Sequence, residues 1–207
     1  MATTGFFNDG TYYGQSEFAQ YFKNMFENGI SINDDGTMAF KVSAGSGKVS
    51  VAPGYAIANG YWFFQPTEAT LAISIPSSGS AYRLIVIEIN ASKMTAEFKV
   101  LSGSAATKPA EPAITQNNDI YQLCLASVLV NSNGIMSITD CRPDRNYCGA
   151  IRPKGLSEMN EVIASAQERF QKWFEAVQPK VERHIYIQAD EPQEAVEGSI
   201  WIHRIEG

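Results

Sequence analysis

Charged side chains, basic clusters and long apolar runs are scarce or missing in this chain of 207 residues. Charged residues make up 18% of the sequence, the formal net charge is −6, and the lysines and arginines form no cluster. Because a nucleic-acid-binding domain normally carries a basic stripe, we expect no nucleic-acid partner. No stretch approaches the roughly 18 apolar residues of a membrane span. Residues 1–10 lack the basic segment and apolar core of a signal peptide, so we expect synthesis in a cytosol and no membrane span.

Metal-binding and nucleophilic residue types are also few. The two histidines, His184 and His203, lie far downstream of the three cysteines. Cys141 and Cys148 are separated by a spacing that matches no common zinc site. Together with Cys124 they form an odd set, which is typical of reduced thiols in a cytosol, while a Cys141–Cys148 disulfide is an open alternative. We therefore predict no metal site and no cofactor.

No catalytic motif offsets this scarcity. No serine, histidine and acidic residue stand in a recognisable catalytic frame, and no glycine-rich loop precedes a helix. Asp140 and Asp144 alternate with Arg142 and Arg145, and we interpret these four as a structural ion-pair cluster at the end of a sheet. A cell-wall hydrolase would need two carboxylates about 5–10 Å apart, for which the sequence offers no motif. We predict that the protein is not an enzyme and has no catalytic residue.

An apolar period of two is the main pattern between residues 36 and 140, and turns such as Asn59-Gly60 interrupt it. This pattern is typical of strands, and the segments 82–90 and 120–130, which are apolar on both faces, are predicted to be central strands. Further strands are predicted at 37–42, 48–52, 55–58, 61–64, 69–75, 94–101 and 135–139. Before them, a short helix with its N-cap at Ser16 carries an aromatic face that we expect to pack on the sheet. The strand spacing favours an antiparallel β-sandwich.

After the strands, apolar residues recur at alternating spacings of three and four, which is the pattern of a coiled-coil helix. The seam consists of Leu156, Met159, Ile163, Ala166, Phe170, Trp173 and Val177. We predict that these residues form an oligomer interface, because one amphipathic helix after a β domain can bury its seam against other copies. The large rings of Phe170 and Trp173 favour three or more helices over two. The alternative is that the helix folds back on its own sheet, and Pro179 is expected to end or kink it.

These patterns together predict a mainly β fold. We expect an antiparallel β-sandwich with a short N-terminal helix, followed by a long amphipathic helix that forms a trimeric coiled coil, and then a small C-terminal β-hairpin. The predicted boundaries are 1–150 for the sandwich with its N-terminal arm and short helix, 151–182 for a linker and the oligomerisation helix, and 183–207 for the last strand pair.

A run of four aromatic residues, 61–64, lies within one predicted strand. Alternation places Tyr61 and Phe63 on one face and Trp62 and Phe64 on the other. One of these faces belongs to the core, and the other is open to a sugar, to a protein partner or to the first helix. Trp62, Phe64 and Trp201 are therefore the candidate contacts to a glycan or a partner.

Several short motifs resemble those of tail-tip and baseplate structural proteins of tailed phages, especially phages of Gram-positive bacteria. Within that group the chain is most similar to the upper-baseplate or receptor-binding-adaptor N-terminal regions, over most of residues 6–150. The motifs are Phe6-Phe7-Asn8, Tyr21-Phe22, Asn28-Gly29-Ile30, the run 49–60, Tyr82-Arg83-Leu84-Ile85-Val86-Ile87, the run 108–112, Tyr121-Gln122-Leu123-Cys124-Leu125-Ala126, Ile138-Thr139-Asp140-Cys141-Arg142 and Cys148-Gly149. The segment 191–202 also resembles a short element that recurs in phage tail proteins. The position of Arg142 resembles a signature position of that family. We expect Arg142 to pair with Asp140 or with nearby carbonyls.

The resemblance implies a function in virion assembly. Members form trimeric or higher assemblies that anchor host-recognition parts, so the implied protein is a structural component of a phage or prophage tail tip or baseplate. Its expected partners are itself as a homotrimer, other tail or baseplate proteins and a host cell-surface glycan, and its expected location is the virion after synthesis in the bacterial cytoplasm. The alternative function is a carbohydrate-binding receptor-binding module that recognises cell-surface glycans. The chain departs from the family because only the short segment 183–207 follows the predicted helix.

Overall fold

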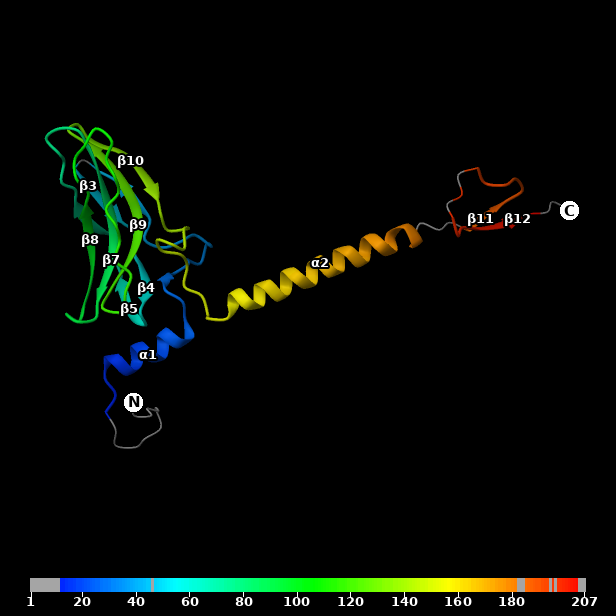
Figure 1. The fold of residues 1–207 in the computed structure, drawn as a ribbon, viewed down its shortest axis with the longest axis horizontal. Helices are drawn as coiled ribbons and strands as arrows, with labels where there is room; N and C mark the ends of the chain where they lie inside the picture. The colour runs from blue at the N-terminus through cyan, green and yellow to red at the C-terminus, as the bar shows by residue number, and fades with distance from the viewer. Residues whose placement is uncertain (1–11, 46, 182–184, 194, 196, 205–207) are drawn as a thin grey trace. The chain divides into compact units, whose positions relative to one another are not determined.

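The computed structural model describes residues 12–45, 47–181, 185–193, 195 and 197–204, without the side chains of 157 and 177–181. The chain divides into two compact units, Met1–Lys154 and Gly155–Gly207, and each is described by itself. Figure 1 shows that strands make up most of the first unit, and that the second contains one long helix and two short strands.

One layer of the first unit is an antiparallel sheet of four strands in the order β10-β9-β7-β8. Its members are β7 (Ser80–Asn90), β8 (Thr95–Ser102), β9 (Ile120–Asn131) and β10 (Gly134–Asp140). The two central strands, β7 and β9, are the ones that the sequence predicted from their double-sided apolar pattern. That prediction is confirmed, because most side chains of both strands are buried on both faces.

The opposite layer consists of two antiparallel sheets of three strands each, in the orders β1-β4-β5 and β2-β3-β6. Their members are β1 (Gly29–Ile30), β2 (Val42–Ala44), β3 (Lys48–Val51), β4 (Gly54–Ala58), β5 (Tyr61–Gln65) and β6 (Ala69–Ala72). The β4–β5 hairpin turns at Asn59-Gly60, where both residues have positive φ, as the predicted two-residue turn requires. The mainly β, antiparallel fold class is thus confirmed.

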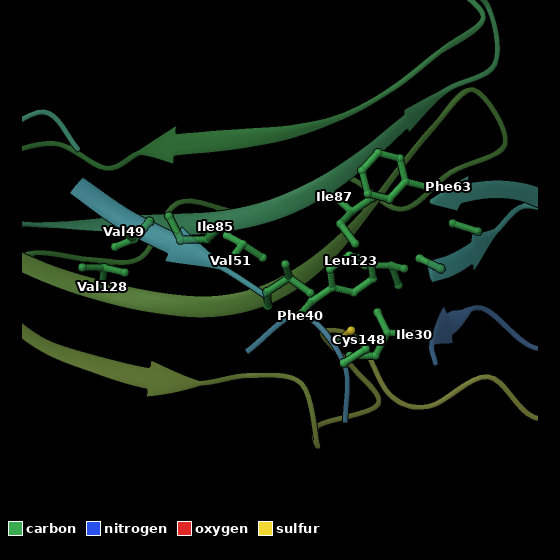
Figure 2. Packing of buried hydrophobic residues seen from close by; sticks show 14 of the residues in the cluster. Ile30, Phe40, Val49, Val51, Phe63, Ile85, Ile87, Leu123, Val128 and Cys148 are labelled. Atoms are coloured by element: carbon green, nitrogen blue, oxygen red, sulfur yellow. The ribbon is translucent and has the colours of Figure 1, made fainter. Parts of the chain in front are cut away.

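The core lies between these layers (Figure 2). Val49 and Val51 of β3 pack in one cluster with Ile85 of β7 and Val128 of β9, and all four are fully buried. Toward the other end, the rings of Phe40, Phe63 and Phe98 meet with centroids 5.2–6.0 Å apart, two of the three pairs edge to face. Such aromatic contacts stabilise a core by about 0.5–1.5 kcal/mol per pair beyond burial alone.

An irregularity in β9 keeps both halves of that strand in this core. Ile85 pairs with Ala126, but Val86 pairs with Cys124, so Leu125 is an extra residue without a partner in β7. Side chains alternate along a strand, so one extra residue changes which positions face the core: odd-numbered residues before it and even-numbered residues after it. Leu123 and Leu125 therefore share the core with Val128 and Val130, although their positions differ in parity.

The outer face of the four-stranded sheet carries a second, smaller cluster. Leu84 and Val86 of β7 pack with Cys124 of β9 and with Cys141. The segment after β10 covers this cluster, and the Cys124 N–H donates to the Tyr147 carbonyl at 2.9 Å. This cover explains why β7 and β9 are apolar on both faces.

The predicted strand at 37–42 is wrong, because only Val42 of this segment lies in β2. Phe40, which is fully buried, has a φ of 57°, a conformation that interrupts any regular strand. The Arg142 guanidinium donates through Nη1 to the carbonyls of Met38 and Ala39, at 2.5 and 2.9 Å. These carbonyls are therefore satisfied by a side chain instead of a neighbouring strand.

The N-terminal helix α1 (Gln15–Met25) begins before Ser16, the residue predicted as its N-cap. Gly14 is the N-cap, and its N–H donates to the Glu17 carboxylate at 2.9 Å, while Ser16 Oγ donates to the same carboxylate. The expected packing of the aromatic face is only partly realised. Ala19 is buried, but the large side chains of this face are 38–50% exposed: Phe18, Tyr21, Phe22 and Met25.

The second unit contains the helix α2 (Leu156–Val181) and the strands β11 (Ile185–Gln188) and β12 (Ile200–His203). The helix was expected to end or kink at Pro179, but its bounds extend two residues further. The two strands pair with each other, as a small two-stranded sheet, but they run parallel. The predicted C-terminal hairpin is therefore wrong in its direction. No helix in the described part of the chain has the length and apolar character to cross a membrane.

Candidate functional site

We first searched the described residues for groups that bind metal or perform acid–base chemistry. Within the described ranges, no three histidine, cysteine or acidic side chains are grouped so that they could hold a metal ion. Among the residues that the structure describes, the carboxyl groups with a shifted pKa are those of Glu17, Asp35, Glu88 and Asp140, and all four shift downward. A glycosidase needs a carboxylic acid with a raised pKa as its proton donor, and none of these four is such a group.

Glu88 shows why these pKa values fall. Burial by itself would raise the pKa of this carboxyl, but it accepts hydrogen bonds from Lys99 and from Gln122, and the net shift is downward. The Lys99 ammonium, paired with it, has a raised pKa because of the same hydrogen bond. This is a structural ion pair across neighbouring strands β7 and β8.

Of the predicted ion-pair cluster at the end of β10, the pair of Arg142 with Asp140 is confirmed. Arg142 pairs with Asp140 through Nη2 at 2.6 Å, and its Nε donates to the same carboxylate at 2.8 Å. These bonds lower the pKa of Asp140. Arg145, in contrast, pairs with Glu27 instead of Asp144. Arg142 thus binds Asp140 and nearby carbonyls together, as expected for it.

The three cysteines are free thiols and all are buried. Burial raises the pKa of the Cys148 thiol to about 12. The hydrogen bond with Cys141 and burial raise the pKa of Cys124 as well. The Cys141–Cys148 disulfide that the sequence left open is not formed in this structure.

The seam of α2 is exposed to solvent. Met159, Ile163, Phe170 and Trp173 are 50–62% exposed. Ala166 is also exposed and Leu156 is half-buried, while the Val177 side chain lies outside the described residues. The Phe170 ring lies 5.7 Å from that of Trp173 and 6.4 Å from that of Phe174. The seam is therefore a continuous apolar stripe on one side of the helix.

The polar contacts of α2 lie on other sides of the helix. Lys172 donates to Glu168 at 2.7 Å, and Gln171 donates to Glu175 at 2.9 Å, both with an i,i+4 spacing. In the heptad set by the seam these residues occupy b, c and f positions, which face water in a coiled coil. The helix therefore has one apolar side and one polar side.

Trp62 and Phe64 form an aromatic ridge on β5. They are 62% and 52% exposed, and their rings stack with centroids 5.4 Å apart and planes only 5° from parallel. Tyr55, which pairs with Phe64 in β4, is also exposed. The sequence placed Trp62 and Phe64 together on one face, and the structure brings them into contact. Trp201, the third candidate, lies on β12 in the second unit.

A pocket of about 330 Å³ adjoins the ridge, lined by Phe22, Ile57, Gly60 and Trp62. A second pocket of about 320 Å³ lies next to it and includes Phe18 of α1 and Met94. Neither pocket is lined by a charged side chain. The sequence interpretation missed the contribution of Phe22 and Met94, since nothing in their spacing links them to β5.

Four exposed isoleucines of the last two strands were not among the predicted contact residues. Ile185, Ile187, Ile200 and Ile202 are 50–66% exposed. Their alternation within each strand was a usable signal, but only the parallel register shows that all four lie on one face.

The comparisons with known proteins give one distant similarity. No protein-family model matches the chain, and no curated protein matches it. Among solved structures, the chain is similar to the crystal structure of the gene 22 product of the Bacillus subtilis SPP1 phage, with 11% sequence identity and a TM-score of 0.35. The similarity covers 48% of this chain and 76% of that chain. It is a distant structural similarity to a phage protein over about half of the chain, and it assigns no activity or partner.

Proposed function

We propose that the protein is a non-enzymatic structural component of a phage or prophage tail tip or baseplate. In this proposal α2 joins three copies through its seam, and the sandwich of the first unit docks on neighbouring tail proteins and carries host-recognition parts. The observation that carries the proposal is the exposed seam of α2, whereas the first unit has a closed core of its own. The class of assembly comes from the family resemblance of the sequence motifs.

The exposed seam favours self-association on energetic grounds. Burial of a large apolar side chain contributes roughly 1.5–3 kcal/mol before ordering costs. Met159, Ile163, Phe170 and Trp173 together therefore offer several kcal/mol per helix. This is enough to stabilise a small bundle, and a single helix in water leaves all of it unrealised.

The shape of the apolar stripe favours three helices over two. Val162 and Phe174, at g and e positions, are 67% and 47% exposed and widen the stripe beyond the a and d positions. A wide stripe with large rings is better covered by two neighbouring helices than by one. In a trimer each helix contacts two others, so both flanks are covered.

The proposal for the first unit rests on the aromatic ridge and its pockets. Exposed rings beside an apolar pocket are typical of the buried centre of a protein–protein contact. The pocket lined by Phe22, Ile57 and Trp62 suits an apolar side chain from a neighbouring protein. Multivalent display by a trimer would then convert weak single contacts into firm attachment.

Light scattering of the full chain tests the self-association. We expect a mass near three times the 22.7 kDa of one chain. The variant Ile163→Asp places a carboxylate in the seam and should give the mass of a single chain, with unchanged β-sheet circular dichroism. Ala164→Asp is the matched control, because Ala164 is exposed at a b position of the same helix and the variant should keep the wild-type mass.

Two results would contradict the proposal. If the wild-type chain is monomeric up to high micromolar concentration, the proposed trimer is contradicted. An Ile163→Asp variant that loses its β-sheet signal together with its mass means that the helix belongs to the folded monomer instead of an interface.

Glycan binding is the second candidate function, because Trp62 and Phe64 expose aromatic rings of the kind that stack on sugars. The mutual stacking of the two rings uses one face of each, and the adjoining pocket offers no charged side chain to bind hydroxyl groups. Titration of the protein with bacterial cell-wall polysaccharide, followed by tryptophan fluorescence, tests this function. Saturable quenching in the wild type that is lost in Trp62→Ala would favour the glycan over the protein partner.

A further inference from the structure

The small sheet of the second unit has one face made of branched aliphatic side chains. Ile185 pairs with Ile200, and Ile187 pairs with Ile202, in a parallel register. Paired residues lie on the same face of a sheet, and residues two apart share that face. Ile185, Ile187, Ile200 and Ile202 thus form one surface, the isoleucine face, with no charged residue in it.

The opposite face is the less open of the two. It carries Tyr186, Trp201 and His203, and Trp201 is 40% exposed, less than any residue of the isoleucine face. The Trp201 indole N–H donates to the Gln188 carbonyl at 3.1 Å, and its ring lies 5.5 Å from that of His203. The uncovered apolar surface of this sheet is therefore the isoleucine face.

A sheet of this kind is not stable while that face is in water. An isolated two-stranded sheet is marginal at best, and parallel strands normally occur with both faces covered. Each isoleucine that becomes fully buried contributes roughly 1.5–3 kcal/mol. The cover for this face therefore supplies much of the stability of the sheet.

We propose that the isoleucine faces of three copies of this chain pack against one another and form a second self-association site. The inference rests on the proposed function, since the seam of α2 brings the copies together. Only residues 182–184 separate α2 from β11, so a trimeric α2 holds the three sheets at an effective concentration on the order of millimolar. A different protein would have to compete with neighbours that are tethered this closely.

The isoleucine face itself carries no charge that would oppose a copy of the same sheet as the occupant, so like faces meet without repulsion. The loop between the strands is acidic, with Asp190, Glu191 and Glu197 all exposed, which disfavours an anionic membrane surface. Around a three-fold axis the same residue of each copy stands at the same height, so the Ile187 side chains of the three copies approach one another.

Thiol crosslinking in the full chain tests this arrangement. Ile187→Cys places a thiol on the isoleucine face, and His203→Cys is the matched control on the opposite face. The native cysteines are buried and so do not compete for a short bis-maleimide crosslinker. We expect about tenfold more covalent dimer and trimer from Ile187→Cys than from His203→Cys, because the high effective concentration applies to one face only.

The double variant Ile163→Asp with Ile187→Cys should lose this crosslinking, because the sheets are then no longer held together. Ile202→Cys, on the paired strand, repeats the test if Ile187→Cys fails to fold. A wild-type trimer whose Ile187→Cys and His203→Cys variants crosslink equally overturns the inference and leaves the proposed function standing. A monomeric wild type overturns both, and light scattering tells the two outcomes apart.

Discussion

The two units of the chain differ in where they keep their apolar side chains. In the part of the chain that the structure describes, every buried hydrophobic residue lies in the first unit, between Ala19 and Cys148. Among the described residues of the second unit none is buried, although it holds a 26-residue helix and six large apolar residues in two strands. The first unit is stabilised by its own hydrophobic core. The described apolar side chains of the second unit can be buried only by contact with other surfaces. Each experiment below probes one side of this contrast.

Matched isoleucine truncations provide the sharpest test of this difference. Ile85 is fully buried in the first unit and Ile163 is 50% exposed in the second. Ile85→Ala should lower the free energy of unfolding of the first unit by about 2–5 kcal/mol, the usual range for core truncation. Ile163→Ala should leave that free energy unchanged within about 0.5 kcal/mol. Urea denaturation followed by the β-sheet signal measures both, and equal losses would mean that the units share one core.

Gly60→Ala tests how much the close packing of α1 on the β4–β5 turn contributes to stability. A Cβ at Gly60 would stand 1.7 Å from the Ala19 carbonyl oxygen, and its φ of +80° is already unfavourable for alanine. We expect a loss of about 1–3 kcal/mol and release of α1 to limited proteolysis. Gly36→Ala is the matched control, since Gly36 has the same φ and no atom within 4 Å of its Cβ position. If both variants lose the same stability, the close approach of α1 does not matter.

Arg142→Ala tests the bracing of the irregular segment around Phe40. The Arg142 side chain is 11% exposed and its guanidinium satisfies the carbonyls of Met38 and Ala39, so its loss should cost about 1–3 kcal/mol. Asp140→Asn should cost about 1 kcal/mol or less, because Asp140 is half exposed.

The Asp140 pair also has a defined pH dependence. The pKa of Asp140 is lowered from 3.8, so its contribution is complete above that value and disappears as the pH falls through the lowered pKa. The difference in unfolding free energy between wild type and Asp140→Asn should vanish at strongly acid pH. A difference that persists there would assign the effect to packing instead of charge.

The last expected effect concerns Cys148 and appears only at alkaline pH. Its pKa rises from 9.0 in the unfolded chain to about 12 in the fold, so its stabilising contribution is complete below pH 9 and is lost between these values. By pH 10 the loss should be about 1 kcal/mol. Chemical denaturation at pH 8 and pH 10 should show a smaller alkaline loss for Cys148→Ala than for wild type. Equal losses would contradict the assignment.

The elements that the sequence predicts well are those in which a local pattern and the tertiary environment agree. The Asn59-Gly60 turn follows from local backbone preference, and the central strands β7 and β9 follow from their apolar faces. The segment around Phe40 does not, because its conformation depends on Arg142, which is about a hundred residues away. Alternation alone predicts a strand there, and only the long-range hydrogen bonds exclude it.

The candidate surfaces divide in the same way. The α2 seam and the pairing of Trp62 with Phe64 on one face follow from spacing within a single element. The pocket beside Trp62 needs Phe22 and Met94 from distant segments, and the isoleucine face needs the parallel register of β11 and β12. Strand direction depends on the connection between strands, which the side-chain pattern does not encode.

The unpaired Leu125 divides β9 into two segments of opposite phase. In its N-terminal half the odd-numbered residues face the core, and in its C-terminal half the even-numbered residues do. Deletion of this one leucine would bring Ala126 next to Cys124 and restore a regular ladder in which Val128 and Val130 still face the core. A chimera with a related strand that lacks the extra residue must therefore be aligned with a one-residue gap at Leu125, so that the C-terminal half presents the same side chains to the core.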